Sequence, residues 1–299
     1  MRIHPFLSCL FATSLLLAPA SQAAQKKKKK PVSVHKPEPA PAPSKRETGE
    51  DDDDMELAAK GAIVIEAISG KTLFEKNADA RFYPASTTKI MTGLLIIEAG
   101  NLDAGVEVNE EDARVGESSL AIKPGQVFSR RQMLYGLLLK SANDVAHALG
   151  RDNGGSIDAF AEKMNQRAKE LGCTNTHFTN PHGLHNSAHY TTPRDLALIA
   201  RAAMHQPLFR QIVASRHAEW STGTGAFMLT NHNRLLDRFT GCNGVKTGYT
   251  IPAQQVLASS AARGGREAIA VVMHTDKPGI WEDSAKLLEF GLRQPPINP

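Results

Sequence analysis

The chain has 299 residues, of which 41% are hydrophobic, so it can bury a full core and still leave a segment outside it. One large domain with an appendage fits this composition better than two equal domains. The formal charge of +4 comes largely from a lysine run near the N-terminus, and the other charges mix both signs without a basic stripe, which argues against nucleic-acid binding.

Residues 1–23 have the pattern of a cleaved signal peptide. A positive charge at Arg2 precedes a mostly apolar stretch from Phe6 to Ala18, and small residues surround a cleavage site near Ala23. About 13 apolar residues fall short of the roughly 20 that span a bilayer, so we predict no stable membrane anchor. We expect an exported protein that acts in the periplasm or another extracytoplasmic space.

Residues 24–57 are expected to form a disordered, charged and proline-rich linker. They contain the lysines 26–30 and the aspartates 51–54, and they bury too little apolar surface to offset the entropy of ordering. The lysine run is compatible with contact to anionic lipid or wall polymer, although such a run is more often simply solvated.

Strand signals occur at both ends of the remaining chain. A β-rich run at residues 61–65 and a serine-glycine turn predict a hairpin with residues 72–74. Near the other end, residues 255–261 and 268–273 predict two more strands on either side of a glycine turn.

Helical patterns fill the chain between these strands. Residues 88–98 are apolar nearly all round and predict a buried helix, whereas residues 129–140 and 156–171 are amphipathic. A further helix is expected to begin at Thr192, where a hydroxyl N-cap precedes Pro193 at the first helical position.

Helices that lie between two terminal pairs of strands predict an α+β fold, with an antiparallel sheet flanked by a helical region. We expect this domain to cover residues 58–293, followed by a C-terminal tail at residues 294–299. After signal cleavage the chain would contain two cysteines, Cys173 and Cys242. An oxidising compartment permits a disulfide between them, which would close a loop of about 70 residues and stabilise the folded protein by about 4 kcal/mol. Two free thiols are an equally good interpretation.

The first cluster with chemical meaning is Pro84-Ala85-Ser86-Thr87-Thr88-Lys89, at the start of the predicted buried helix. Positions i and i+3 of a helix share a face, so Lys89 can place its amine beside the Ser86 hydroxyl. A serine becomes a good nucleophile when a neighbouring base takes its proton, and lysine is such a base when burial or another cation lowers its pKa. A serine at a helix N-terminus also places its own backbone N–H where an oxyanion can be held.

Two further clusters follow along the chain, Ser141-Ala142-Asn143 and Lys246-Thr247-Gly248. A serine three residues before a lysine is common by chance, but the three clusters together match the Ser-x-x-Lys, Ser-x-Asn and Lys-Thr-Gly set in order and spacing. With these motifs the chain resembles the serine D-alanyl-D-alanine carboxypeptidases, which are low-molecular-mass penicillin-binding proteins. The likeness covers about residues 58–290 and includes Leu134-Tyr135-Gly136-Leu137-Leu138 and Asn180-Pro181-His182-Gly183-Leu184.

The resemblance implies a penicillin-binding, serine β-lactamase-like fold and an enzyme that needs no cofactor. The enzyme would remove the terminal D-alanine from peptidoglycan stem pentapeptides, and β-lactam antibiotics would be its covalent inhibitors. Ser86 would attack the carbonyl between the last two D-alanines, and Lys89 would accept its proton. Ser141 would relay a proton to the leaving amine, and Asn143 would orient Lys89 and the substrate amide.

The same resemblance places the substrate-binding residues on an edge strand. Lys246 and Thr247 would bind the terminal carboxylate of the substrate, and Gly248 would keep the strand open to the ligand. The backbone N–H of Tyr249 would complete the oxyanion hole with that of Ser86.

Three departures from the family pattern are visible. Ala142 stands where relatives often have glycine, a small change that we expect to be tolerated. Some relatives bind the substrate carboxylate with an arginine before the last helix, where this chain offers Lys277 instead. Many relatives continue into a second, β-rich domain and a membrane anchor, while this sequence ends soon after Phe290.

Other titratable residues have plainer interpretations. A histidine cluster invites a metal site, but it fits no helical histidine pair with a glutamate, and Pro181 and Gly183 mark a loop there, so we predict no metal. Its members are His177, His182, His185 and His189. Asp195 and Glu98 are interpreted as a helix-capping acid and a helix-surface charge.

Three other functions can be weighed against the carboxypeptidase. A β-lactamase of the best-known class deacylates with a glutamate and a water, but the nearest candidate, Glu162, lies inside a predicted helix. A D,D-endopeptidase that cuts peptidoglycan cross-links is the closest rival. A non-catalytic wall-binding protein is a weaker one, because all three motifs are intact.

Overall fold

The computed structural model describes residues 55–295. The expected signal peptide at residues 1–23 and nearly all of the expected linker at 24–57 lie outside the described residues, as do residues 296–299 of the expected tail. Among the described residues, no helix combines the length and the apolar composition that a membrane crossing requires.

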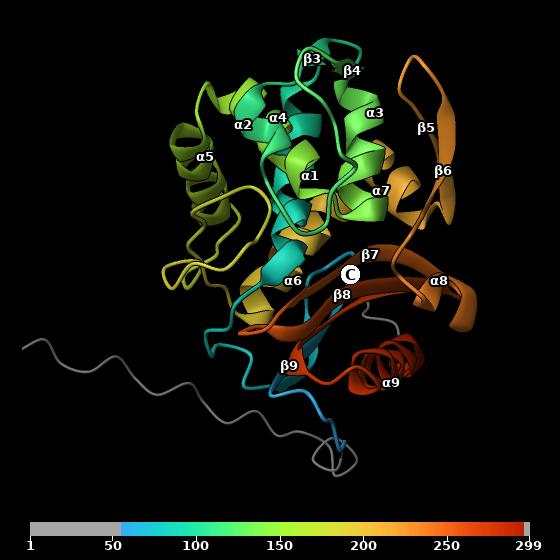
Figure 1. The fold of residues 1–299 in the computed structure, drawn as a ribbon. Coiled ribbons are helices and arrows are strands. Elements are labelled where there is room, and N and C mark those ends of the chain that lie inside the picture. The colour runs from blue at the N-terminus through green and yellow to red at the C-terminus, as the bar shows by residue number, and fades with distance from the viewer. Residues whose placement is uncertain (1–54, 296–299) are drawn as a thin grey trace, which may run out of the picture. The chain divides into compact units, whose positions relative to one another are not determined.

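Five antiparallel strands form the main sheet, in the order β2-β1-β9-β8-β7 (Figure 1). The strands are β1 (Gly61–Glu66), β2 (Thr72–Lys76), β7 (Cys242–Thr250), β8 (Gln254–Arg263) and β9 (Arg266–Thr275). The first strand pairs with the last, from Gly61 opposite Met273 to Glu66 opposite Ala268. The order leaves β7 at an edge, with one side free of a neighbouring strand in this sheet.

Helices cover both faces of this sheet (Figure 1). One face is covered by α9 (Gly279–Arg293), and the other by a larger helical region. That region contains α1 (Lys89–Ala99), α2 (Glu110–Ala113), α3 (Arg130–Tyr135), α4 (Asn143–Gly154), α5 (Ile157–Glu170), α6 (Pro193–Met204) and α7 (Pro207–Ala214). The predicted α+β class and antiparallel sheet are confirmed.

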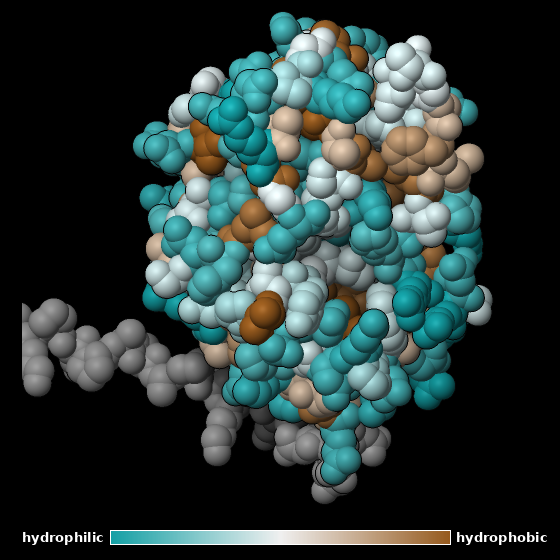
Figure 2. Space-filling model, viewed as in Figure 1, coloured by the Kyte–Doolittle hydropathy of each residue, from teal (hydrophilic) through white to brown (hydrophobic). Residues whose placement is uncertain are grey.

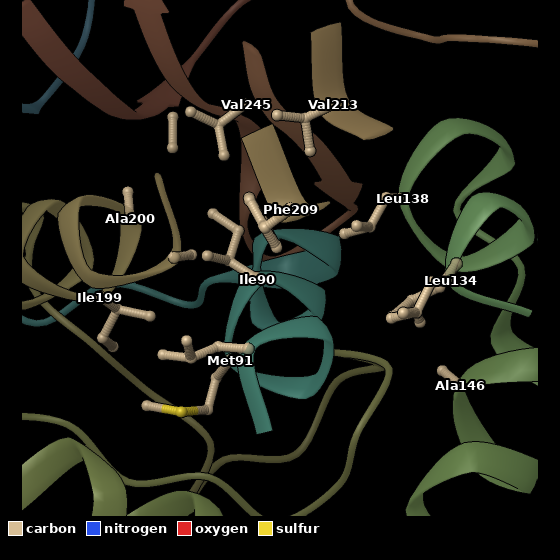
Figure 3. Close-up of a cluster of buried hydrophobic side chains, with 14 of the residues drawn as sticks. Ile90, Met91, Leu134, Leu138, Ala146, Ile199, Ala200, Phe209, Val213 and Val245 are labelled. Atoms are coloured by element: carbon tan, nitrogen blue, oxygen red, sulfur yellow. The ribbon is translucent and has the colours of Figure 1, made fainter. Parts of the chain in front are cut away.

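The helix α1 lies at the centre of the helical region, as its apolar sequence predicts. Figure 3 shows Ile90 and Met91 of α1 among side chains from the surrounding helices and from β7. Leu138 and Phe209 approach from two of these neighbours, and both are buried. Because α1 is held on all sides, the residues at its N-terminus occupy a fixed position.

Alternate residues of the sheet belong to two separate hydrophobic cores. Val256 and Ala258 of β8 belong to the core shared with the helical region, whereas Leu257 belongs to the core under α9. This alternation follows from the two-residue period of a strand. Because β7 pairs with β8, the same alternation indicates which face of the sheet each residue of β7 lies on.

Several elements were not predicted from the sequence. They are the helices α2, α4 and α7, the short helix α8 (Leu235–Arg238), the hairpin of β5 (His217–Ser221) with β6 (Ala226–Thr230), and the two-stranded pair of β3 (Gly105–Glu107) with β4 (Val127–Ser129), which lie on either side of α2 in the chain. On the face seen in Figure 2, hydrophobic residues are scattered in small groups among hydrophilic ones. Short strands with little alternation of polar and apolar residues give only a weak sequence signal.

One predicted helix is shorter than expected. The helix predicted at residues 129–140 is α-helical only to Tyr135 and continues as a π-helical turn, Gly136–Lys140.

The two cysteines of the domain do not form a disulfide. Cys173 and Cys242 are free thiols. The Cys173 thiol donates to the backbone carbonyl of Asp195, and the Cys242 thiol to that of Gly244.

Candidate active site

Ser86 lies in a short 3₁₀ helix, η1 (Ala85–Thr88), that leads directly into α1. Lys89 is the first residue of α1, and its Nζ lies 3.0 Å from the Ser86 Oγ. The predicted pairing of these two side chains is therefore present, although the serine belongs to the 3₁₀ turn rather than to the α-helix. The residue before the serine, Ala85, has a φ of 47°, in the left-handed region.

The Lys89 amine is fully buried and held by three oxygen atoms. Besides the Ser86 hydroxyl, it contacts Asn143 Oδ1 at 2.7 Å and the backbone carbonyl of His182 at 2.6 Å. No carboxylate of the described residues forms an ion pair with it. Burial first, and then the charge of Lys246, hold the pKa of Lys89 well below its ordinary value.

This environment makes Lys89 suitable as a base. A neutral amine has two N–H bonds and one lone pair, and the carbonyl oxygens of Asn143 and His182 can accept both N–H bonds. The lone pair is then left for the hydroxyl proton of Ser86. The geometry therefore fits proton transfer from the serine to the lysine when the serine attacks.

Ser141 and Asn143 lie at the junction between the π-helical turn and α4. Ser141 has a φ of 65° and lines the same cleft as Ser86. The Asn143 side chain donates from Nδ2 to the carbonyl of Gly116 at 3.0 Å. That contact fixes which way the amide faces, so that Oδ1 is the atom presented to Lys89.

The edge strand β7 supplies the other wall. Lys246 is buried, and burial lowers its pKa to about 7. Thr247, Gly248 and Tyr249 all line the cleft. A Cβ at Gly248 would lie 2.9 Å from the Ser86 nitrogen, so glycine is required for the close approach of β7 to η1. This close packing is a second reason for glycine at position 248, and the expectation that Gly248 keeps the strand open to ligand stays a prediction.

The cleft between these walls has a volume of about 550 Å³, and it is lined by Ser86 together with residues that belong to none of the three motifs. Ser118, in the loop before β4, lines it near Ser141. Arg234, Lys277 and Trp281 also line it. Of these, the sequence pointed only to Lys277, because the other two belong to no motif.

The loop containing Pro181 and His182 was only recognised as part of the family likeness, yet it completes the surroundings of Lys89. The Pro181 carbonyl accepts from the Thr92 hydroxyl at 2.7 Å, next to the contact of the His182 carbonyl with Lys89. Gly183 follows in the left-handed region, with a φ of +86°, and packs against the carbonyl of Ala85. A backbone carbonyl carries no residue-type signal, so no motif search could have found it.

The histidines of this loop have structural partners. His189 Nδ1 accepts from the Thr179 N–H at 3.0 Å, so its Nε2 donates to the Thr88 hydroxyl at 2.8 Å. Burial lowers the pKa of His189 to about 3, which keeps the ring neutral. Within residues 55–295 no group of three or more histidine, cysteine or acidic residues is placed to hold a metal ion.

The acidic residues considered from sequence lie outside the cleft. Glu162 is exposed on α5, away from Ser86. Glu98 pairs with Arg167 at 2.7 Å. Asp195 is buried, and its carboxylate accepts from the Asn175 N–H at 2.8 Å, so it secures the preceding loop rather than only capping a helix.

Comparison with known proteins identifies clear relatives. The family model described as D-alanyl-D-alanine carboxypeptidase matches residues 46–277. The D-alanyl-D-alanine carboxypeptidase DacF of Bacillus subtilis is 38% identical over 81% of this chain and 64% of the relative, so this chain spans less than two thirds of that protein. DacB2 of Mycobacterium tuberculosis is 35% identical over 79% of this chain and 82% of the relative.

Solved structures show the same fold. The D-alanyl-D-alanine carboxypeptidase of Mycobacterium tuberculosis H37Rv superposes with a TM-score of 0.78 at 35% identity, covering 81% of this chain and 94% of that one. The Streptomyces K15 DD-transpeptidase has a TM-score of 0.76 at 35% identity, covering 80% and 99%. The expected penicillin-binding fold is therefore confirmed.

Proposed function

Because this chain belongs to the D-alanyl-D-alanine carboxypeptidase family of serine peptidases, we propose that it removes the terminal D-alanine from peptidoglycan stem peptides. The observation that carries this is the buried Lys89 amine, 3.0 Å from the Ser86 hydroxyl with its other contacts occupied by carbonyl oxygens. The reaction proceeds through an acyl-enzyme on Ser86.

Acylation uses the two walls of the cleft together. The Ser86 Oγ attacks the carbonyl between the last two D-alanines while Lys89 takes the hydroxyl proton. The N–H groups of Ser86 and Tyr249 stabilise the resulting oxyanion. Because these donors are already in position, the protein does not have to rearrange when the charge develops. Ser141, across the cleft from β7, passes a proton to the departing amine, and water later releases the shortened peptide.

The terminal carboxylate of the donor peptide is bound by β7. Thr247 offers its hydroxyl, and Lys246 supplies positive potential from the buried side of the strand. The β-lactams inhibit by the same route, because they acylate Ser86 and leave an ester that this site hydrolyses slowly. Within the described part of the chain no carboxylate contacts Lys89, which supports a peptidase that penicillin traps rather than a β-lactamase.

The nucleophile can be tested by mass spectrometry after incubation with a penicillin. We expect the mass of one β-lactam to be added to a single peptide, the one that contains Ser86, and Ser86→Ala to abolish the adduct. A fluorescent penicillin would show the same result in a gel. An adduct on another residue, or none on folded protein, would contradict the assignment and would favour a non-catalytic wall-binding protein.

The pH dependence of acylation should distinguish the roles of Lys89 and Lys246. Acylation of a carboxylate-bearing donor needs neutral Lys89, so kcat/KM rises with pH through the lowered pKa of that residue. It needs protonated Lys246, so kcat/KM falls above the pKa of about 7. In Lys246→Arg the alkaline limb should disappear, because arginine keeps its charge to above about pH 12.

The matched control is Lys71→Arg, which makes the same change on an exposed turn and should leave the profile unaltered. An alkaline limb that persists in Lys246→Arg would show that a group other than Lys246 controls carboxylate binding. Circular dichroism of both variants checks that the buried arginine is accommodated.

We also propose that the protein is exported and that residues 1–23 are removed. The N-terminal composition and a substrate class that lies outside the cytoplasm support this. N-terminal sequencing of the exported form should begin near Ala24. An exported form that retains Met1 would rule out cleavage.

A further inference from the structure

Asp144 is a fully buried carboxylate that takes no part in the proposed reaction. It lies in the first turn of α4, directly after Asn143. A buried carboxylate is normally paired with a cation, yet within residues 55–295 the partners of Asp144 are uncharged donors. They are the Ser119 hydroxyl at 2.6 Å and the N–H groups of Leu120 at 3.1 Å, Ile122 at 3.3 Å and Val145 at 2.9 Å. Three of these four donors belong to the short stretch 119–122.

Segment 116–122 depends on such polar contacts for its position. It contains no helix or strand, and Ile122 has its only buried side chain. Ser118, in the same segment, lines the cleft together with Ser86 and Ser141. Because apolar burial contributes little here, the hydrogen bonds to α4 must hold this part of the cleft wall in place.

The same segment holds Asn143. The Ser118 carbonyl accepts from the Asn143 N–H at 2.7 Å, and the Ser118 hydroxyl donates to the carbonyl of Lys140 at 3.0 Å. The Gly116 carbonyl accepts from Asn143 Nδ2 at 3.0 Å, while Oδ1 of that amide accepts from Lys89 at 2.7 Å. The position of the Gly116 carbonyl therefore decides whether the amide presents its oxygen to Lys89.

The donors around Asp144 require a carboxylate. Oδ2 accepts from Ser119, Leu120 and Ile122, and Oδ1 accepts from Val145 and also from Leu120. An asparagine offers one acceptor oxygen, and its amino group would face N–H or O–H groups that need an acceptor. Some of these buried donors would then lose their partner, which is costly.

We propose that Asp144 is a positioning residue for the base Lys89. It holds segment 116–122 against α4, the Gly116 carbonyl of that segment orients the Asn143 amide, and the amide orients the Lys89 amine. Asp144 does not line the cleft, so it acts through these contacts and not on the substrate. This inference rests on the proposed function, in which Lys89 takes the proton of Ser86.

The test is the rate of labelling by a fluorescent penicillin, measured over a range of concentrations for Asp144→Asn. We expect the rate constant at saturating penicillin to fall by at least about tenfold, because a displacement of about 1 Å in a reacting group can cost about 10²-fold. The concentration that gives half the maximal rate should change less. A loss of stability alone would reduce the amount of protein that is labelled and leave this rate constant unaltered.

The lost charge of Asp144 does not imitate the effect. Burial first, and then the charge of Lys246, lower the pKa of Lys89, whereas the charge of Asp144 opposes them. Removing that charge would leave more Lys89 in its neutral form, in which it accepts a proton. A slower rate would therefore report the position of the amine.

A double-mutant cycle tests the route through Asn143. Once Asn143→Ala has removed the amide, Asp144→Asn should lower the remaining rate by less than about threefold, because residues that act through one contact are not additive. A tenfold loss in both backgrounds would show that Asp144 acts by another route and would overturn the inference.

Asp112→Asn is the matched control. Asp112 is also fully buried and also binds α4, through His147 at 2.7 Å and Arg151 at 2.7 Å, but its side chain makes no hydrogen bond to segment 116–122. Its replacement should lower Tm and leave the rate constant of labelling at the parent value. An equal loss of rate in Asp112→Asn and Asp144→Asn would overturn the inference.

The outcomes separate the inference from the proposed function. If the parent protein is not labelled, the proposed function fails and the inference fails with it. If the parent is labelled and Asp144→Asn has the same rate constant, the inference alone fails. Should Asp144→Asn not fold, Ser119→Ala decides, because it removes only the 2.6 Å bond. It should lower the rate constant by at least about threefold, and an unchanged rate constant would overturn the inference.

Discussion

Replacing Lys89 with alanine is expected to lower the acylation rate of Ser86 by about 10²–10⁴-fold for every peptide donor and every β-lactam, the usual contribution of a general base. The amine is the only side-chain nitrogen of the described residues that contacts the Ser86 hydroxyl. The other groups around it, the Asn143 amide and the His182 carbonyl, cannot take up a proton at neutral pH. The rate of labelling by a fluorescent penicillin, followed with time, measures the effect.

Lys89→Arg provides the control for charge. Arginine keeps a cation at this position but cannot act as a base near pH 7, so it should lose acylation as alanine does. Lys246→Arg should by contrast weaken peptide turnover and still show measurable acylation. A Lys89 variant that is folded by circular dichroism and retains more than about a tenth of the parent rate would contradict the base assignment.

Among the glycine-to-alanine substitutions in the domain, Gly183→Ala is expected to lower the stability most. Gly183 has a φ of +86°, where an alanine costs about 1–2 kcal/mol, and the new Cβ would overlap the backbone carbonyl of Ala85. The loop or η1 must therefore move. We expect a loss of at least about 3 kcal/mol, which lowers Tm by about 6–12 °C in a domain of this size.

The same change should slow acylation, because Ala85 immediately precedes Ser86, the proposed nucleophile. A displacement of about 1 Å in a reacting group can cost about 10²-fold in rate. Thermal denaturation and penicillin labelling, measured on one preparation, give both effects.

Gly172→Ala is the matched control for the backbone contribution. Gly172 has a φ of +83°, almost the same as Gly183, but nothing lies within 4 Å of its Cβ position. It should lose only about 1–2 kcal/mol and label at the parent rate. Equal effects of the two substitutions would show that the contact with Ala85 is unimportant.

The sequence by itself determined the local elements and the chemistry of the motifs. The apolar run after Ser86 predicts the buried helix that is α1, and the hydroxyl of Thr192 caps α6 by accepting from the Asp195 N–H at 3.1 Å. The strands at both ends of the domain follow from their β-rich composition. These features depend on residues close together in the chain, where propensity and periodicity act.

Other features were decided only by the tertiary structure, because they join residues far apart in sequence through atoms that carry no motif. The His182 carbonyl reaches Lys89 across 93 positions, and Asn143 reaches it across 54. The lowered pKa of Lys89 results from complete burial, which depends on how α1, α4 and the loop before α6 pack together. The placement of Arg234 and Lys277 in one cleft depends on how α8 and α9 meet the edge strand, and nothing in the local sequence of either residue encodes that geometry.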